Sequence, residues 1–197
     1  PVRFIGNHST GKMGKAIANT LADRGANVEL VLGPVDTHGI SPKINVTKIT
    51  SAQEMYEACQ TIFKNCDAGI LAAAVADFTP TDYSNKKIKK GENDNLQLSM
   101  TRTPDVLASL GKSKKEHQVL AGFALETHDE INHAQKKLDK KNLDFIVLNS
   151  MNDEGAGFAK DTNKITLIEK NGKKHTFDTK SKKEVSVDIV NLLQKYL

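Results

Sequence analysis

The sequence predicts an α/β fold: a doubly wound, mainly parallel Rossmann-like sheet with helices on both faces, followed by a C-terminal β-hairpin plus helix. Strand-like apolar runs alternate with amphipathic helical segments through most of the chain, which is typical of βαβ units in a parallel sheet. Near the end, an Asn-Gly dipeptide separates two strand-like runs and favours a hairpin. The 197 residues have the length of one domain, so we expect residues 1–197 to form a single unit.

The first half of the chain has the pattern of a βαβ unit. The apolar spacing predicts, in order, a helix over 13–24, a strand over 28–32, a helix over 51–65 and a strand over 68–73. Only residues 1–5 precede the first glycine, and they are too few for a complete first strand. We therefore expect the numbering to begin inside a longer natural chain.

The second half continues this alternation and then becomes antiparallel. The spacing predicts, in order, a helix from residue 103, a strand over 118–124, a helix over 129–141 and a strand from residue 143. Asn171-Gly172, between the runs ITLIEK and KKHTF, predicts a tight hairpin turn with positive φ at both central positions. Ser181 and Glu184 match a capping box, which predicts a last helix over 184–196.

The composition excludes several classes of function. The sequence has no signal segment and no apolar run of membrane length, so we expect a cytoplasmic protein with no membrane partner. Cys59 and Cys66 lack metal-type partners and are expected to be reduced thiols. The net charge of +4 comes largely from lysine clusters, and only 5% of residues are aromatic. This combination disfavours a nucleic-acid platform and favours small phosphorylated ligands.

The segment GNHSTGKMG, residues 6–14, joins a strand-like run to a helical one. Unpaired backbone N–H groups at such a helix start attract anions. Gly11 and Gly14 are expected to let a phosphate approach the backbone and to let the helix pack close to the sheet, while Ser9 or Thr10 caps the helix or binds the ligand. The segment is not a Walker A loop, because a methionine stands where a Ser or Thr is required. A capped helix without a ligand is the alternative interpretation.

Two further segments favour a ligand site. AAAVADFTP, residues 72–80, is a small-residue strand end followed by Asp77, and doubly wound folds bind ligands outside the carboxyl ends of their strands. A run of four lysines with one isoleucine follows at residues 86–90. It is either a solvated loop or a mobile cationic lid over phosphates.

Together these segments resemble phosphopantothenoylcysteine synthetase, the ligase of coenzyme A synthesis that many bacteria carry as the C-terminal half of a protein fused to a flavin-dependent decarboxylase. The resemblance rests on VRFIGNHSTGKMGKAIA, AAAVADFTP, KIKK at 87–90, TPDV at 103–106, GFALET at 122–127 and KKLDKKNLD at 136–144. Family members usually begin with one more strand carrying a Gly-Gly-Thr loop, which is absent from this sequence. No decarboxylase half is present either, so FMN is expected only in a fused or associated decarboxylase.

The resemblance implies a two-step ligation. The carboxylate of 4′-phosphopantothenate attacks the α-phosphate of CTP to give an acyl-cytidylate and pyrophosphate, and the amine of L-cysteine then displaces CMP. Mg²⁺ is expected to bridge the triphosphate oxygens. CTP is expected because the motifs are of the bacterial type. The family works as a dimer in which the lysine-bearing segment of one subunit helps to close the site of the other, so we expect at least a homodimer.

Site residues follow from the same match. Asn7 is expected to hold the acyl-cytidylate during amine attack, with Arg3 and Ala74 also on the phosphopantothenate side. Lys87 is the expected lid lysine that acts on the triphosphate. The positions implied for the nucleotide are Ser9, Gly11, Gly14, Ala72, Ala73, Asp77, Lys87, Thr103, Pro104, Asp105, Val106, Phe123, Lys137 and Lys141. No metal ligand is assigned.

Each of these residues also has a plainer interpretation. Asn7 could merely shape the turn, Phe123 could be a core residue, and Lys137 and Lys141 could be surface residues of a helix. Tyr83 and Lys87 have the spacing of a short-chain dehydrogenase pair, but turn-forming residues surround them and the dinucleotide glycine pattern is missing. A third alternative is a non-catalytic nucleotide-binding scaffold for a decarboxylase.

Overall fold

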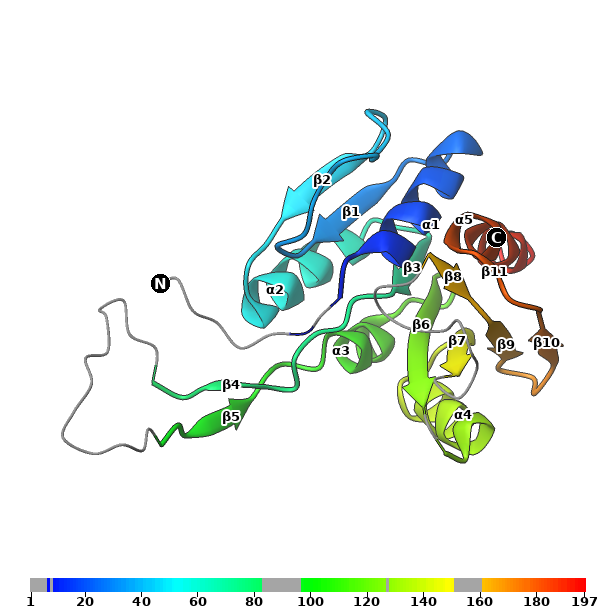
Figure 1. Cartoon of the computed structure of the whole chain (residues 1–197). Coiled ribbons are helices and arrows are strands. Elements are labelled where there is room, and N and C mark those ends of the chain that lie inside the picture. Colours follow the sequence, from blue (N-terminus) through cyan, green and yellow to red (C-terminus); the bar gives the residue numbers. More distant parts are fainter. Residues whose placement is uncertain (1–6, 8, 83–96, 127, 151–160) are drawn as a thin grey trace.

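A mixed sheet forms the centre of the fold in the computed structural model, which describes residues 7, 9–82, 97–126, 128–150 and 161–197 (Figure 1). Among these residues, the sheet has five strands in the order β10-β9-β7-β6-β3. Strands β3, β6 and β7 pair in parallel, and β9 and β10 continue the sheet antiparallel. The bounds are Ala68–Leu71 for β3, Val119–Glu126 for β6, Phe145–Ser150 for β7, Ile165–Glu169 for β9 and Lys174–Thr176 for β10.

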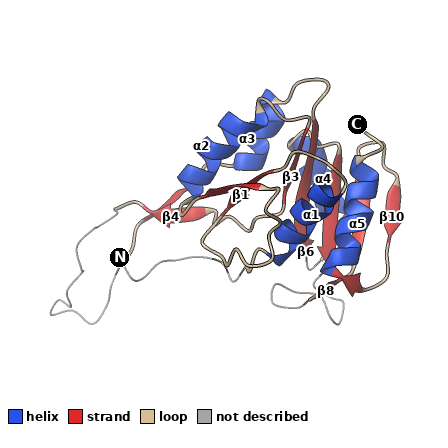
Figure 2. Ribbon diagram, turned by 90° about the horizontal axis from the view of Figure 1, so that it is seen from above, coloured by secondary structure: helices blue, strands red, loops and turns tan. Residues whose placement is uncertain are grey.

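Helices cover both faces of this sheet, as the sequence predicts. Figure 2 shows α1 and α5 side by side over one face, while α2, α3 and α4 pack on the other. The bounds are Lys12–Asp23 for α1, Ala52–Phe63 for α2, Val106–Ser113 for α3, Glu130–Lys140 for α4 and Lys182–Leu193 for α5. The predicted helices and strands therefore exist, with ends that differ by a few residues.

The strand sequences explain why both faces are buried. In β7, Phe145 and Val147 join the core under α1 and α5, whereas Ile146 and Leu148 join the core under α2, α3 and α4. Successive side chains of a strand point to opposite faces, so a continuous apolar run fits a sheet that is covered twice. Each of these four side chains is at most 4% exposed.

A second, two-stranded parallel sheet contains β1 (Glu29–Leu32) and β2 (Asn45–Lys48). The sequence predicts β1 but not β2. Three of the four β2 residues are exposed, so this strand lacks the apolar pattern that reveals a buried strand. Val28 and Ile44 lie just before the two strands and pack against α1 in a small core of their own.

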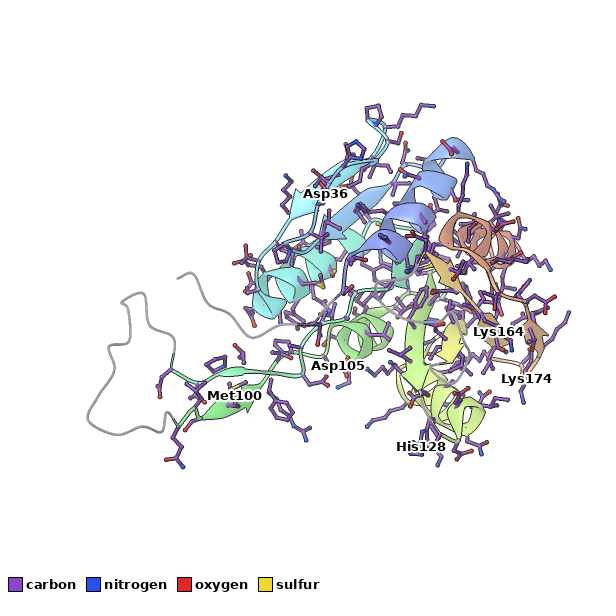
Figure 3. The ribbon with its side chains drawn as sticks, in the orientation of Figure 1. Asp36, Met100, Asp105, His128, Lys164 and Lys174 are labelled. Carbon is purple, nitrogen blue, oxygen red and sulfur yellow. The ribbon has the colours of Figure 1, made fainter. Side chains whose placement is uncertain are left out.

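An antiparallel ribbon, β4 (Phe78–Pro80) and β5 (Met100–Arg102), projects from the body of the molecule (Figures 1 and 3). These strands are not predicted from the sequence. Both are short and nearly all of their residues are exposed, so neither alternation nor burial marks them in the sequence. The ribbon follows directly after the small-residue loop at 72–77.

The C-terminal hairpin exists, but its turn differs from the prediction. Gly172 has a φ of 84°, whereas Asn171 is not in the positive-φ region. The Gly172 N–H donates to the Glu169 carbonyl at 2.9 Å, and the Glu169 N–H donates to the Lys173 carbonyl at 2.9 Å. This is the three-residue hairpin loop with glycine in the left-handed position, so only one residue needs positive φ.

The helix after the hairpin has the capping box that the sequence predicts. The Ser181 hydroxyl accepts from the Glu184 N–H at 3.3 Å, and the Glu184 carboxylate accepts from the Ser181 N–H at 3.0 Å, which completes the capping box. Two short strands, β8 (Thr162–Asn163) and β11 (Lys180–Ser181), pair beside the start of this helix. The helix starts two residues earlier than predicted because Ser181 is the N-cap.

Both cysteines carry free thiols, in agreement with the prediction. Burial raises the pKa of Cys59 to about 11 and also raises the pKa of Cys66. A thiol with a raised pKa stays protonated at neutral pH and reacts slowly. A membrane-spanning helix, which would have to be long and apolar, does not occur in the described part of the chain.

Candidate functional site

The loop at 72–77 forms the centre of the candidate site at the carboxyl end of β3. Asn7 reaches this loop from the segment before α1, and its side-chain amide donates to the Ala74 carbonyl at 2.7 Å. Two of the three residues that the resemblance assigns to the phosphopantothenate side, Asn7 and Ala74, are therefore in direct contact. The bond uses one hydrogen of the Asn7 amide, which leaves its second N–H hydrogen and its oxygen for other partners.

Thr103 contacts the same loop two and three residues further along the chain. Its hydroxyl donates to the Ala76 carbonyl at 2.6 Å, and its backbone N–H donates to the Asp77 carbonyl at 3.0 Å. The loop is thus held between Asn7 and Thr103 through its own backbone carbonyls. These contacts place Asn7, which is assigned to the phosphopantothenate side, and Thr103, which is assigned to the nucleotide, on the same loop.

The start of α1 offers backbone donors without a side-chain cap. Gly11 is the N-cap residue with a φ of 69°, and no described side chain caps this helix end. A Cβ at Gly11 would lie 2.9 Å from Val35 Cγ2, so both the backbone and the packing favour glycine. Ser9 lies half-buried just before this turn. The free N–H groups of such a helix end can bind a phosphate.

Gly14 does not have the packing role that the sequence suggested. A Cβ at this position would meet nothing within 4 Å, so close approach of the helix to the sheet does not require glycine here. The part of the prediction that concerns packing is wrong. Approach of a ligand to the Gly14 backbone stays a prediction.

The start of α3 is capped by its own side chain, in contrast to α1. Asp105 is the N-cap and accepts from the Ala108 N–H at 2.9 Å (Figure 3). The predicted helix from residue 103 therefore begins at Val106, after Thr103 and Pro104. The Val106 side chain is only 5% exposed and belongs to the core, so any role of this residue toward a ligand is limited to its backbone.

Lys137 and Lys141 lie one helical turn apart and contact different elements. The Lys137 ammonium donates to the Phe123 carbonyl of β6 at 2.8 Å, and the Lys141 ammonium pairs with the Asp105 carboxylate at 2.9 Å. The Phe123 side chain packs against the core under α1 and α5, so its carbonyl is what this residue presents to Lys137. The two predicted nucleotide lysines are thus held at the carboxyl end of β6, beside the start of α3.

Neighbouring charges and burial shift the pKa values of Lys137 and Asp105. Burial and the neighbouring Lys141 ammonium lower the pKa of Lys137, while the carboxylates of Glu126, Asp105 and Asp77 oppose that effect. For Asp105, burial alone would raise the pKa, but the hydrogen bonds from the Ala108 N–H and from Lys141 lower it overall. Groups with shifted pKa values that converge on one site are typical of functional sites.

Two residues at the edge of this cluster, Glu126 and His133, were not predicted from the sequence. Glu126 ends β6, and its carboxylate lies 3.5 Å from His133 Nδ1 on α4. The His128 ring lies edge-on to the His133 ring, with the centroids 5.2 Å apart (Figure 3). A signal for His133 was present, because it lies four residues before Lys137 and eight before Lys141.

Several predicted residues lie outside the described part of the chain. These are Arg3, Lys87 and the Tyr83 of the dehydrogenase alternative, together with the other lysines at 86–90. Ala72 and Ala73 belong to the loop at 72–77, directly after β3. Within the described ranges, no group of three or more His, Cys, Asp or Glu side chains could hold a metal ion.

A comparison with protein families shows the family of the chain. Residues 1–197 match the family "DNA/pantothenate metabolism flavoprotein C-terminal domain". The chain belongs to this family. The solved C-terminal domain of a coenzyme A biosynthesis bifunctional protein CoaBC has the same fold, with a TM-score of 0.80 and 37% identity, and the match covers 99% of this chain and 88% of that domain.

Full-length relatives of this flavoprotein C-terminal domain carry two kinds of name. The bifunctional protein CoaBC of Bacillus subtilis (strain 168) is 44% identical, over 96% of this chain and 46% of its own length. A protein of an unknown prokaryotic organism named cysteine/cysteine sulfinic acid decarboxylase is 53% identical, over 96% of this chain and 53% of its own length. The chain thus spans about half the length of these relatives.

Proposed function

We propose that this chain is the phosphopantothenate–cysteine ligase domain of a coenzyme A biosynthesis protein, with CTP as the activating nucleotide. The observation that carries the proposal is the convergence on the loop at 72–77. Asn7 contacts its Ala74 carbonyl, Thr103 contacts its Ala76 and Asp77 carbonyls, and Asp77 is coupled electrostatically to Lys137. The residues assigned to the acyl group and to the nucleotide therefore meet at one sheet edge, where open α/β sheets bind ligands.

In the first proposed step, a carboxylate oxygen of 4′-phosphopantothenate attacks the α-phosphorus of CTP. The bond from that phosphorus to the bridging oxygen breaks, and pyrophosphate leaves with the bonding electron pair. The uncapped start of α1 can bind phosphate oxygens, and Lys137 and Lys141 can balance the growing negative charge. We assign Lys87 to the same charge balance, on the resemblance alone.

In the second proposed step, the amine of L-cysteine attacks the acyl carbon of the cytidylate. The carbon–oxygen bond to CMP breaks, and the amine nitrogen loses a proton to solvent or base. The Asn7 amide is a neutral donor whose second hydrogen can bond the carbonyl oxygen as that oxygen becomes negative. Its bond to Ala74 fixes its orientation before the reaction begins.

Mg²⁺ would neutralise the triphosphate and the leaving pyrophosphate in this scheme. In nucleotide sites this ion is usually held by substrate phosphates and one or two carboxylates rather than by a protein cage. The described residues contain no ready-made cluster of metal ligands. We therefore infer that the ion would arrive with the nucleotide, held chiefly by its phosphates.

The test is pyrophosphate release with CTP, ATP, GTP and UTP in turn, with and without 4′-phosphopantothenate and L-cysteine. We expect release that requires 4′-phosphopantothenate, is fastest with CTP, and yields the cysteine conjugate only when cysteine is present. Bound nucleotide without any turnover in a folded protein would instead favour the scaffold alternative. Lys87→Gln should slow acyl-cytidylate formation about 10²–10³-fold, with Lys86→Gln as its neighbour control.

The name of the 53% identical relative suggests a second candidate, decarboxylation of cysteine or cysteine sulfinic acid. That relative is about twice as long as the stretch it shares with this chain, so its name describes a larger protein. Release of labelled CO2 from L-cysteine by this chain alone would support the second candidate. We expect none under conditions in which pyrophosphate release is rapid.

We further infer that the protein works as a homodimer, with the β4–β5 ribbon at the interface. Phe78, Leu98 and Met100 are 50%, 48% and 39% exposed on or beside a ribbon that projects into solvent (Figures 1 and 3). Exposed apolar side chains grouped in this way are typical of contact surfaces. Light scattering should give about twice the chain mass of 21.6 kDa.

The interface can be tested with a matched pair of variants. Phe78→Ser should shift the protein toward the monomer, whereas Ile131→Ser, which changes an apolar residue of similar exposure (43%) on α4, should not. An active protein of monomer mass would contradict the dimer. Equal effects of both variants would remove the ribbon from the interface.

A further inference from the structure

His133, Lys137 and Lys141 form a stripe along one face of α4, which we call the α4 stripe. They lie four residues apart, so their side chains leave the helix on the same side. Each contacts a different partner: His133 lies 3.5 Å from the Glu126 carboxylate, Lys137 donates to the Phe123 carbonyl at 2.8 Å, and Lys141 pairs with Asp105 at 2.9 Å. The stripe joins α4 to the end of β6 and to the start of α3.

Lys137, the middle residue of the α4 stripe, uses the smallest share of its hydrogen-bonding capacity among the contacts described. An ammonium has three donor hydrogens, and the Phe123 carbonyl is a neutral acceptor that uses one of them. Lys137 is half-buried, and a buried charge requires compensation by an opposite charge. Asp105 is already engaged, because it caps α3 and pairs with Lys141.

Glu126 is placed to supply this compensation. Glu126 follows Phe123 by three residues on β6, and His133 precedes Lys137 by one turn of α4. The contact between Lys137 and Phe123 and the contact between His133 and Glu126 are therefore neighbours along the strand and the helix. Three carboxylates, those of Glu126, Asp105 and Asp77, favour the charged form of Lys137. The Glu126 side chain is 26% exposed, and that of His133 is 35% exposed, so solvent screens the pair only partly.

We propose that Glu126 is a positioning residue for nucleotide binding: its carboxylate, which lies 3.5 Å from His133 Nδ1, is the electrostatic partner that holds the Lys137 ammonium in place for a nucleoside triphosphate. The proposal rests on the proposed function for the identity of that ligand. Glu126 acts through Lys137 and does not touch the phosphates, because a carboxylate in direct contact with a triphosphate would repel it. His133 orients the carboxylate from the other side.

The coupling between Glu126 and Lys137 has a consequence for pH that separates it from a purely structural role. The charged groups that face Lys137 are Lys141 on α4, Asp105 at the start of α3, Asp77 in the loop after β3, and Glu126 on β6. Removing the charge of Glu126 leaves burial and Lys141 less opposed, so the pKa of Lys137 falls. Nucleotide binding by the variant should then weaken at a lower alkaline pH than in the wild type.

The first experiment measures the Lys137 titration in the ligand-free protein by NMR of its ε-methylene carbon, in wild type, Glu126→Gln and Glu57→Gln. Glu57 is an exposed carboxylate on α2 that pairs with Gln53, so its variant controls for a general loss of negative charge. We expect a lower Lys137 pKa in Glu126→Gln alone. An unchanged Lys137 titration in Glu126→Gln overturns the proposal, whatever ligand the protein binds.

The second experiment measures binding of Mg·CTP by calorimetry across pH. Glu126→Gln should weaken binding about twofold to fivefold at neutral pH, the effect of one partly exposed charge pair, and more at alkaline pH. Glu126→Asp should recover part of the loss and serves as the second variant if Glu126→Gln melts early. In a Lys137→Arg background, where the cation does not titrate, Glu126→Gln should no longer shift the alkaline limb.

The outcomes distinguish this inference from the proposed function. Wild type that binds no nucleoside triphosphate contradicts the proposed function, while the ligand-free titration still decides whether Glu126 is the counter-ion of Lys137. If wild type binds Mg·CTP but Glu126→Gln has the same effect with and without the Lys137→Arg change, the inference alone is overturned. In that case Glu126 acts independently of Lys137.

Discussion

The two helix starts that border the site, those of α1 and α3, differ in how their backbone donors are used. The segment before each helix contacts the loop at 72–77: Asn7 does so before α1, and Thr103 does so before α3. The α1 start has Gly11 in the left-handed region and no cap from any described side chain, whereas the α3 start is capped by Asp105, which also pairs with Lys141.

This difference assigns the two helix starts separate tasks. No described side chain caps the N–H groups at the start of α1, and together with the helix dipole such groups favour a bound anion. At the start of α3 the carboxylate already neutralises the helix end and a lysine. The α3 start therefore holds charged side chains in place, while under the proposed function the α1 start would bind the ligand. The following changes test that division, beginning with the largest expected effect.

Asn7→Asp should have the largest effect, on the α1 side. An ionised carboxylate cannot donate to the Ala74 carbonyl and repels negative charge that develops on the acyl oxygen. We expect conversion of the acyl-cytidylate to slow about 10²–10³-fold, while pyrophosphate release in the first turnover continues. Quenched-flow detection of the accumulated intermediate is the measurement. Normal consumption of the intermediate by Asn7→Asp would remove Asn7 from this role.

Gly111→Ala should be the most destabilising of these changes and acts on the α3 side. A Cβ at this position would lie 1.9 Å from the Lys141 carbonyl oxygen, which is backbone and cannot rotate away. We expect a loss of about 1–3 kcal/mol in the free energy of unfolding, from denaturant titration, with weaker nucleotide binding because Lys141 moves. Gly14→Ala is the control, because its Cβ meets nothing within 4 Å. Equal stability of Gly111→Ala and wild type would contradict the close packing of α3 on the end of α4.

Gly11→Ala should cost somewhat less stability, on the α1 side. The φ of 69° is unfavourable for alanine by about 1–2 kcal/mol, and the new Cβ would press on the Val35 side chain, which can shift. Thermal melting should show the loss. If Gly11→Ala melts like wild type, the turn adopts another conformation and the picture of an open α1 start fails.

Asp105→Asn should have the smallest effect, and that effect depends on pH. Asparagine keeps the helix cap, so the change isolates the charge pair with Lys141, which is worth a few tenths of a kcal/mol, up to about 1 kcal/mol. The pKa of Asp105 is lower in the folded protein than in the unfolded chain, where it is about 3.9. Its stabilisation is therefore full above that value and is lost as the pH falls through the folded pKa.

Urea titrations of Asp105→Asn and wild type at pH 7 and near pH 3 measure this pH dependence. The difference in stability between the two proteins should be present at pH 7 and should shrink in acid. A difference that stays constant across this range would mean that the loss comes from the cap rather than from the charge.

The sequence predicts the buried elements well because their burial is visible in it. The apolar run FIVLNS and the small-residue run AGIL mark β7 and β3, and Ser181 with Glu184 marks the start of α5. Strand β2 and the β4–β5 ribbon were not predicted because their residues are mostly exposed. A hydrophobic pattern carries no information about a strand whose side chains face water.

The site residues were assigned from the family motifs, and their roles toward ligands stay predictions. Asn7, Asp105, Lys137 and Lys141 were assigned in this way. Glu126 lies within the motif GFALET but was not assigned, and neither was His133, because their contact arises from pairing across β6 and α4. Gly14 shows the opposite error, since a motif position need not have the packing role assigned to it. Contacts between distant segments, such as Thr103 with Ala76, depend on the tertiary fold and not on local spacing.

The contacts described for the loop at 72–77 have a consequence for how this family can diverge. Asn7 and Thr103 bind the main-chain oxygens of Ala74, Ala76 and Asp77, and every amino acid presents that oxygen. An alignment of relatives should therefore show stronger conservation at Asn7 and Thr103, which supply the donors, than at 74 and 76, where any residue small enough to fit preserves the bond. We therefore expect the side chains at 74 and 76 to vary more freely than that of Asp77, whose charge acts on Lys137.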